Sequence, residues 1–218
     1  VRSYMLGRKA RLVAREAHRK RGRLLDIGTG TGYFADTMAR RGWKVEAVEK
    51  SPQARAFAKE HFDLDVKPES ALQEFAPGSF DVITLWHVME HLEHLNETWE
   101  MLRELLTEKG MLIVAVPNCS SYDAGRYGEY WAAYDVPRHL WHFTPVTIQQ
   151  LASRHGFIMA ARHPMPFDAF YVSMLSEKHR GSSCSFLKGM YAGTLAWFST
   201  LGRKERSSSM IYVFRKKR

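Results

Sequence analysis

The sequence predicts an α/β fold built on a doubly wound, mostly parallel sheet of seven strands with helices on both faces. Short apolar runs alternate with helical patterns from residue 23 to about residue 116, which is typical of β-α-β units and of a parallel sheet buried on both faces. A glycine-rich turn follows the first apolar run, where a strand is expected to pass into a helix. The 218 residues, 45% hydrophobic and 25% charged, have the composition of one globular domain over residues 1–218.

The first half of the chain carries five of the expected strands, with helices between them. The strands are Arg23–Ile27, Lys44–Val48, a weak one beginning at Val66, Phe80–Leu85 and Met111–Val116. The helices are Tyr33–Arg41, Pro52–Phe62 and Glu93–Leu106. Pro52 occupies the favoured first position of its helix, and Gly110 is expected to mark the end of the third helix.

The second half begins with an aromatic loop over Asn118–Phe143, which is too long to be a simple connection. We expect this loop to act as a lid after the fifth strand. Thr144 and Pro145 predict the N-cap and first turn of a helix that reaches about His155. A strand at Phe157–Ala161, a largely helical insertion at Phe167–Leu201 and a last strand at Met210–Phe214 complete the chain.

The formal net charge of +9 is concentrated at the two ends of the chain. Residues 1–23 carry nine Lys and Arg against Glu16, and residues 203–218 carry seven against Glu205, which leaves a mildly acidic interior. A basic balance raises nucleic acid or an anionic membrane as partners. Because the interior is acidic, we expect the basic ends to lie outside the main functional motif, and nucleic acid is not the favoured partner.

Several classes of protein are excluded by simple counts. Two cysteines, Cys119 and Cys184, are too few for a disulfide scaffold, and no Cys or His cluster has metal-ligand spacing. No apolar run is long enough to span a membrane, and the start shows no signal-peptide pattern. We therefore expect a cytoplasmic protein without a resident metal.

The strongest motif runs from Asp26 through Gly28, Gly30 and Gly32, at the end of the first strand. Glycines let the backbone turn tightly and allow a ligand to approach where a Cβ would block it. A dinucleotide-binding fingerprint would need a third glycine where Tyr33 stands. The carboxylate of Asp26 would also repel a pyrophosphate and attract a cation, so the turn favours a ligand that is positive at that end.

This motif resembles the first motif of the class I S-adenosylmethionine-dependent methyltransferases. Val45 to Glu49 is similar to their second strand, with the acid at its end, and Phe80 to Ile83 followed by Glu90-His91-Leu92 is similar to the fourth strand and its turn. Leu102 to Asn118 resembles the helix and fifth strand that follow. The finer similarity is to small-molecule enzymes such as the ubiquinone-biosynthesis O-methyltransferases. The resemblance implies a Rossmann-like methyltransferase fold, with residues 24–118 as the cofactor-binding half and 119–218 as the substrate-binding half.

The resemblance also implies which residues hold S-adenosylmethionine. Asp26 and the glycine turn would hold the methionine end, and the Glu49 carboxylate would accept hydrogen bonds from both ribose hydroxyls. Ser70 occupies the slot in which the family often has an acid at the adenine, so backbone near Ala71 is an alternative contact. The full set of expected cofactor residues is Asp26, Gly28, Thr29, Gly30, Gly32, Tyr33, Phe34, Glu49, Lys50, Ser70, Ala71, Leu85, Trp86 and His87.

Methyl transfer to a hydroxyl needs a base, and the aromatic loop offers His139 and His142. Loops at the carboxyl ends of parallel strands border the ligand crevice, so this loop can overhang the methyl group. Either histidine could instead hold the loop through a backbone carbonyl, and His87 and His91 are alternative bases. Arg138 could bind an acidic group of the substrate or pair with Asp135.

The leading hypothesis is methyl transfer to a small molecule at oxygen, with an anionic or lipid-like acceptor possible. A nucleic-acid methyltransferase that uses the basic ends, a cofactor-binding module without catalysis, and a nicotinamide-dependent oxidoreductase are the alternatives. The segment Phe186 to Leu201 has an apolar helical stripe, which could pack over the substrate crevice or lie on a membrane surface. Oligomeric state cannot be deduced from the sequence.

Overall fold

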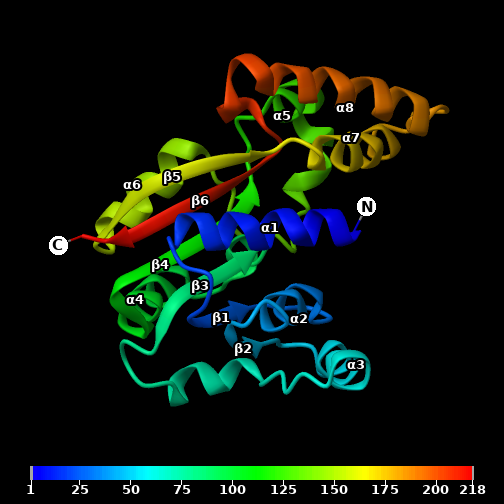
Figure 1. Cartoon of the computed structure of the whole chain (residues 1–218). Helices are drawn as coiled ribbons and strands as arrows, with labels where there is room; N and C mark the ends of the chain where they lie inside the picture. Colours follow the sequence, from blue (N-terminus) through cyan, green and yellow to red (C-terminus); the bar gives the residue numbers. More distant parts are fainter. Residues whose placement is uncertain (1, 218) are drawn as a thin grey trace.

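A mixed six-stranded sheet forms the centre of the computed structural model, which describes residues 2–217 (Figure 1). The strand order is β2-β1-β3-β4-β6-β5. Strands β1 to β4 pair in parallel, whereas β6 is antiparallel to both β4 and β5. The strand bounds are β1 Arg23–Ile27, β2 Lys44–Val48, β3 Phe80–Trp86, β4 Leu106–Pro117, β5 Phe157–Met165 and β6 Ser209–Lys216.

Helices cover both faces of the sheet, as the doubly wound prediction requires. One buried cluster joins the sheet to α4 and α6 through Trp99 and Ile148, and another joins it to α1 and α2 through Val13 and Met38. Figure 1 shows α1 crossing in front of the strands. The helix bounds are α1 Arg2–Glu16, α2 Tyr33–Ala39, α3 Pro52–Phe62, α4 Leu95–Leu105, α5 Tyr122–Tyr127, α6 Pro145–Arg154, α7 Asp168–His179 and α8 Ser185–Gly202.

A smaller hydrophobic cluster holds α5, α7 and α8 together at one end of the sheet, above β6 in Figure 1. Tyr127 and Trp131 from the aromatic loop pack there with Val172 of α7 and Ala192 of α8. Beyond this cluster, short 3-10 helices occur at Glu69–Glu74, Met89–His91, Gly128–Tyr130, Ala132–Tyr134 and Lys204–Arg206. None of the helices within residues 2–217 is long and apolar enough to cross a membrane.

Elements with strong local signals lie where the sequence predicts them. The predicted bounds of β1, β2 and α3 match the structure. Thr144 is the N-cap of α6, and its hydroxyl accepts a hydrogen bond from the Thr147 backbone N–H while the Thr147 side chain bonds back to the cap. Such a capping box satisfies two backbone groups that would otherwise lack partners.

The prediction of seven strands was wrong for the described residues, because the segment at Val66 makes only an isolated bridge. The Lys67 N–H donates to the Ala47 carbonyl, and the Glu49 N–H donates to the Lys67 carbonyl. The next residue is Pro68, which has no N–H with which to continue the ladder.

Three other predicted boundaries also differ from the structure. Gly110 does not end α4, since it lies inside β4 where a Cβ would come within 2.9 Å of the Thr107 carbonyl oxygen. The Asn118–Phe143 loop contains α5 and two 3-10 helices. The helical segment Phe167–Leu201 is two helices, α7 and α8, joined by a turn at Gly181.

Helix α1 was not predicted, because its many basic residues mask the apolar stripe that Ala10 and Val13 bury against the sheet. The two basic ends meet in the structure, where the Arg215 guanidinium donates to the Glu16 carbonyl. The placement of α1 therefore brings basic residues over the sheet, which bears on the site described below.

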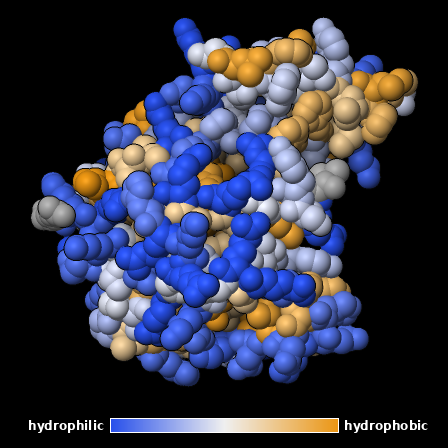
Figure 2. All heavy atoms as spheres, in the orientation of Figure 1, coloured by the Kyte–Doolittle hydropathy of each residue, from blue (hydrophilic) through white to orange (hydrophobic). Residues whose placement is uncertain are grey.

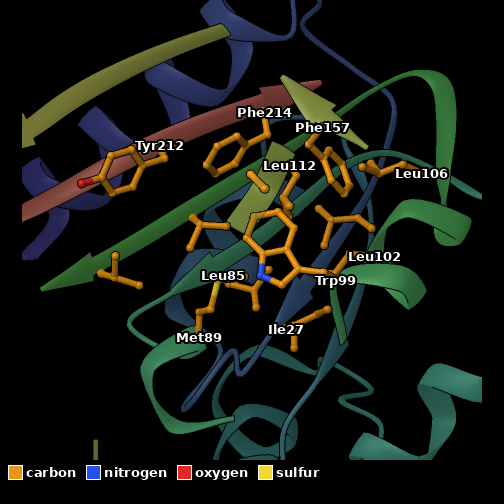
Figure 3. Packing of buried hydrophobic residues seen from close by; sticks show 14 of the residues in the cluster. Ile27, Leu85, Met89, Trp99, Leu102, Leu106, Leu112, Phe157, Tyr212 and Phe214 are labelled. Carbon is orange, nitrogen blue, oxygen red and sulfur yellow. The ribbon is translucent and has the colours of Figure 1, made fainter. Parts of the chain in front are cut away.

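Trp99 of α4 lies at the centre of the larger core, and Figure 3 shows it beside Phe157 and Phe214. Its ring centroid lies 5.4 Å from each of those two rings. We expect Trp99→Ala to lower the free energy of unfolding by about 3–5 kcal/mol, because truncating a buried aromatic side chain leaves a cavity. Urea denaturation measures this, with the exposed Val146→Ala as a control that should change little; a Trp99→Ala effect as small as that of the control would contradict the packing described.

Candidate functional site

The site lies where the carboxyl ends of the parallel strands meet. The chain runs from β1 outward to β2 and then returns to place β3 on the other side of β1. Loops that leave such a sheet in opposite directions open a crevice between them, and ligands bind there in open α/β folds. The glycine turn after β1 and the segment after β3 form the two sides of this crevice.

The glycine turn is held close to both neighbouring strands. The N–H groups of Gly28 and Thr29 donate to the Val48 carbonyl at the end of β2, at 2.9 and 3.2 Å. Gly28 has φ +67°, and a Cβ there would overlap the Val88 side chain in the segment after β3. By contrast, a Cβ at Gly30 would meet nothing within 4 Å. The turn therefore packs tightly at Gly28 and leaves open space at Gly30.

Glu49 lies across this open space and is held by two backbone donors. One carboxylate oxygen accepts from the Gly30 N–H at 2.8 Å, and the other accepts from the Ser51 N–H at 2.9 Å. A carboxylate oxygen can accept a second hydrogen bond, so both oxygens keep capacity for a ligand with two hydroxyls. A cavity of about 530 Å³ adjoins Glu49 and is lined by Ile27, Gly28, Val48, Glu49, Lys50, Glu69, His87, Val88, His91, Leu92, Glu93, His94 and Thr98.

Asp26 is the last residue but one of β1 and is buried. Its carboxylate accepts a hydrogen bond from the Thr84 hydroxyl at 2.6 Å. Burial raises the pKa of Asp26 to about 6, against the opposing effects of the nearby Thr29 and Thr84 hydroxyls and of the Lys9 ammonium. The Thr29 hydroxyl is also buried and has no hydrogen-bond partner within the described residues. A buried carboxylate and an unpartnered hydroxyl beside a cavity suit a ligand that carries a positive charge and donor groups.

Some residues predicted to contact the cofactor lie elsewhere. Phe34 and Leu85 are buried in the core, and Phe34 packs edge-on against Trp86 at 5.1 Å between ring centroids. Ser70 is exposed, while its neighbour Glu69 lines the cavity and Ala71 is buried. An acidic side chain therefore borders the cavity at Glu69, one residue before the position predicted for the adenine contact. Tyr33 packs edge-on against Phe62 at 4.9 Å between ring centroids.

The expectation that the basic ends lie outside the site was wrong for α1. The Lys9 ammonium lies 4.3 Å from the centroid of the Trp86 ring. Burial lowers the pKa of Lys9, against the opposing effect of the carboxylates of Asp168 and Asp26. Arg2 places its guanidinium 4.4 Å from the Tyr33 ring centroid. Because α1 folds back over the sheet, residues far from the motif in sequence come to surround it.

His87 lies between the first cavity and a second, larger one. It has φ +57°, and its Nδ1 and Nε2 atoms lie 3.4 Å from carboxylate oxygens of Glu90 and Asp168 respectively. These carboxylates outweigh the opposing effect of burial and raise the pKa of His87 to about 9. His87 thus joins the segment after β3 to Asp168 of α7, a contact that no sequence motif predicts.

The second cavity, of about 1190 Å³, is lined mostly by apolar and aromatic side chains. Its walls come from the start of α1, the aromatic loop and α7, and it shares His87 with the first cavity. The lining residues are Tyr4, Met5, His87, Glu90, Pro117, Ala132, Ala133, Asp135, Arg138, His139, Phe167, Asp168, Phe170, Tyr171, Val172, Leu175, His179 and Ser209.

The two candidate base histidines occupy different environments. His139 lines the larger cavity, and its Nδ1 lies 2.8 Å from the Ala133 carbonyl oxygen. His142 is exposed, and its Nε2 lies 2.9 Å from the Tyr134 carbonyl oxygen within the aromatic loop. Arg138 donates to the Asp135 carboxylate at 2.7 Å, which matches the pairing considered as its alternative role.

Glu90, His91 and His139 come together at the edge of the larger cavity. One ligand-type atom from each lies within 4.8 Å of the others, an arrangement that could accommodate a metal ion. Residue spacing does not predict this group, because the aromatic loop brings His139 back to the turn after β3. The expectation of a protein without a resident metal stays a prediction.

Comparison with known proteins places this geometry in a family. Residues 1–161 match the family described as methyltransferase domain. A mitochondrial ubiquinone biosynthesis O-methyltransferase of Schizosaccharomyces pombe is 35% identical over 101 residues, covering 43% of this chain and 37% of that protein. A ubiquinone biosynthesis O-methyltransferase of Cereibacter sphaeroides is 30% identical over 158 residues, covering 67% of this chain and 64% of that protein. The chain thus spans less than two thirds of the length of either relative.

Solved structures show the same fold. Phosphoethanolamine N-methyltransferase 2 of Haemonchus contortus, in complex with S-adenosylmethionine, superposes with a TM-score of 0.65 at 21% identity, covering 97% of this chain and 53% of that one. The fold is that of the S-adenosylmethionine-dependent methyltransferases, and the chain belongs to the methyltransferase domain family.

S-adenosylmethionine is the cofactor of this class, and the residues present fit it. The cofactor carries a sulfonium, an amino group and two ribose hydroxyls. The buried Asp26 carboxylate, the open space at Gly30 and the two Glu49 oxygens match a ligand with those groups. The unpartnered Thr29 hydroxyl offers a further polar contact.

We expect Asp26→Asn to stabilise the protein in the absence of ligand. Because burial raises the pKa of Asp26 from 3.8 to about 6, its contribution to stability is full below pH 3.8 and is lost as the pH rises through 6. The difference corresponds to about 3 kcal/mol at most, and the asparagine amide oxygen can still accept from Thr84. Urea unfolding of both proteins should therefore give similar free energies at pH 4 and a more stable variant at pH 7.5. Equal free energies of unfolding for the two proteins at pH 7.5 would contradict the raised pKa of Asp26.

Proposed function

We propose that the chain transfers a methyl group from S-adenosylmethionine to a small molecule, at an oxygen atom. The observation that carries the proposal is the pair of cavities that share His87, one beside the glycine turn and Glu49, the other large and apolar. The names of the curated relatives, which are O-methyltransferases, favour oxygen as the acceptor atom.

In this proposal the first cavity takes the cofactor. Glu49 holds the ribose, Asp26 with the backbone of Gly28 to Gly32 holds the methionine end, and Lys50 and Glu69 border the remaining wall. When bound, S-adenosylmethionine supplies an activated methyl group together with its own leaving group. The protein then has to orient the acceptor, exclude water and take up a proton.

The second cavity takes the acceptor. Its size and its apolar, aromatic walls suit a planar or lipid-like molecule better than a small polar one. The Arg138 guanidinium is already paired with Asp135, so Arg138 is not free to bind an acidic group of the acceptor. The aromatic loop and the α7–α8 insertion would act as the lid and the wall of a substrate-binding half over residues 119–218, within a single methyltransferase domain.

His139 is the preferred base. A carbonyl oxygen only accepts, so in the neutral imidazole the contact with Ala133 requires the hydrogen on Nδ1. The Nε2 atom then keeps a lone pair on a side chain that lines the acceptor cavity. A hydroxyl that takes a methyl group loses its proton, and Nε2 would accept that proton. The exposure of His142 and its contact with the Tyr134 carbonyl favour a role in holding the loop.

We expect Glu49→Gln to weaken S-adenosylhomocysteine binding by about 10-fold to 100-fold, since hydrogen bonds to a charged group contribute about 1.5–3 kcal/mol. Isothermal titration calorimetry measures the change. The matched control is Glu46→Gln in β2, three residues before Glu49. The Glu46 carboxylate lies 3.0 Å from the Lys67 ammonium, and its replacement should leave binding unchanged. Equal affinities for the two variants would overturn the role of Glu49.

We expect His139→Gln to lower kcat by about 100-fold or more, the range of general-base catalysis, with little effect on S-adenosylhomocysteine binding. His142→Gln should leave kcat within a few fold, because His142 does not line the acceptor cavity. Steady-state kinetics with both variants measures this once an acceptor is known. A larger loss of kcat for His142→Gln than for His139→Gln would reverse the assignment.

The experiment that tests the proposal as a whole is methyl transfer from labelled S-adenosylmethionine to fractionated cell extract. Mass spectrometry of the labelled product identifies the acceptor and its methylated atom. A labelled methyl ether or ester supports the proposal. Transfer only to nitrogen, to carbon or to nucleic acid would overturn the oxygen assignment, and absence of any product from a protein that binds S-adenosylhomocysteine would favour a cofactor-binding module.

A further inference from the structure

Helix α8 carries its large apolar side chains on its exposed face. Leu187, Met190, Tyr191, Phe198 and Leu201 recur at helical spacing, and all five are exposed, with Leu187 and Leu201 at 68% and 69%. They lie along one side of the helix over about 21 Å, from the rise of 1.5 Å per residue. In Figure 2 hydrophobic residues gather along α8 at the top of the molecule.

The buried face of α8 is made of small residues instead. Gly189, Ala192, Gly193 and Ala196 are buried against the rest of the protein. A Cβ at Gly189 would lie 2.5 Å from the Met174 Cα atom, so α8 and α7 lie in close contact. The helix therefore docks through its small face, and its large apolar residues do not contribute to the core of this chain.

The charged residues from residue 178 to residue 204 are all basic. Between residues 178 and 204 the chain has no Asp or Glu, while five exposed basic residues occur there, namely Lys178, Arg180, Lys188, Arg203 and Lys204. Among the described residues none of these five takes part in an ion pair. The exposed apolar stripe has unpaired basic residues at its ends and beside it. Such a surface is complementary to a lipid interface, which has an apolar interior and anionic headgroups.

We propose that the exposed face of α8 docks on an anionic lipid surface, with the helix lying in the plane of the interface. Leu187, Phe198 and Leu201 would enter the acyl boundary, and Lys188, Arg203 and Lys204 would contact the headgroups. A second copy of the chain is a poorer occupant, because a two-fold contact through this face would bring the same cations together without an acid to pair with them.

The exposed face of α8 lies on the outer side of a helix pair that also borders the larger cavity. Helix α7, against which α8 packs, also forms a wall of the larger cavity through Phe170, Val172 and Leu175. A chain docked through α8 would hold that cavity close to the lipid. The docking itself needs neither cofactor nor methyl transfer, so its test is independent of the proposed function.

The test is flotation of the purified protein with vesicles, without S-adenosylmethionine. One set of vesicles is phosphatidylcholine alone, and in the other part of it is replaced by phosphatidylserine. We expect binding to the anionic vesicles that weakens as salt is raised, because exposed charges are screened. The triple variant Leu187→Asn, Phe198→Asn and Leu201→Asn should reduce the bound fraction by about tenfold or more, given the loss of apolar insertion.

Two further variants make the result decisive. Val146→Asn with Ile158→Asn removes exposed apolar side chains on α6 and β5 and should bind like the wild type. The triple variant Lys188→Gln, Arg203→Gln and Lys204→Gln should remove the preference for anionic vesicles. If the apolar variant does not show a native melting curve by circular dichroism, this basic-residue variant tests the lipid docking instead.

Three results would overturn the proposal. They are absence of binding to anionic vesicles by the wild type, equal binding by the wild type and the α8 variants, and a dimer in gel filtration that the apolar triple variant converts to a monomer. The last result would assign the face to a second copy of the chain.

Discussion

The close approach of two loops at the β1–β3 crossing is the constraint on which the site depends. At Gly28 the turn after β1 passes the Val88 side chain with no room for a Cβ, while hydrogen bonds to the Val48 carbonyl hold the same turn to β2. With the turn held from both sides, Gly30 is left facing open space, Glu49 reaches it from β2, and His87 lies on the opposite side of the crevice. The smaller cavity lies beside this contact, since Gly28, Glu49 and Val88 all line it.

Several unfavourable features of the fold lie around that contact. Asp26 is buried with a raised pKa, the Thr29 hydroxyl lacks a hydrogen-bond partner among the described residues, and His87 has a positive φ. Groups of this kind cost stability and concentrate where a protein binds or transforms a ligand. The large hydrophobic core around Trp99 offsets that cost. The site is thus arranged for a ligand rather than for the stability of the empty protein.

The α7–α8 pair extends the site outward. Asp168 at the start of α7 faces His87, and residues further along α7 form a wall of the larger cavity. Helix α7 also packs against the small-residue face of α8. One helix therefore connects the crevice, the acceptor cavity and the apolar outer surface. A partner bound at the outer surface and an acceptor in the larger cavity would therefore both act on α7, with no change in the sheet.

The sequence by itself determined the elements whose signals are local. β1, β2, α3 and the cap of α6 depend on apolar runs, a first-turn proline and a threonine within a few residues, and Asp26, the glycines and Glu49 lie within one β-α-β unit whose path is short. Only the tertiary structure decided that Lys9 approaches Asp26, that Asp168 faces His87, that Glu69 rather than Ser70 borders the cavity, and that α8 exposes its large side chains. Some of those contacts join residues far apart along the chain, and others depend on which side of a helix or loop faces the protein. Local hydrogen bonding and residue spacing predict neither feature, because each depends on how complete helices and strands pack together.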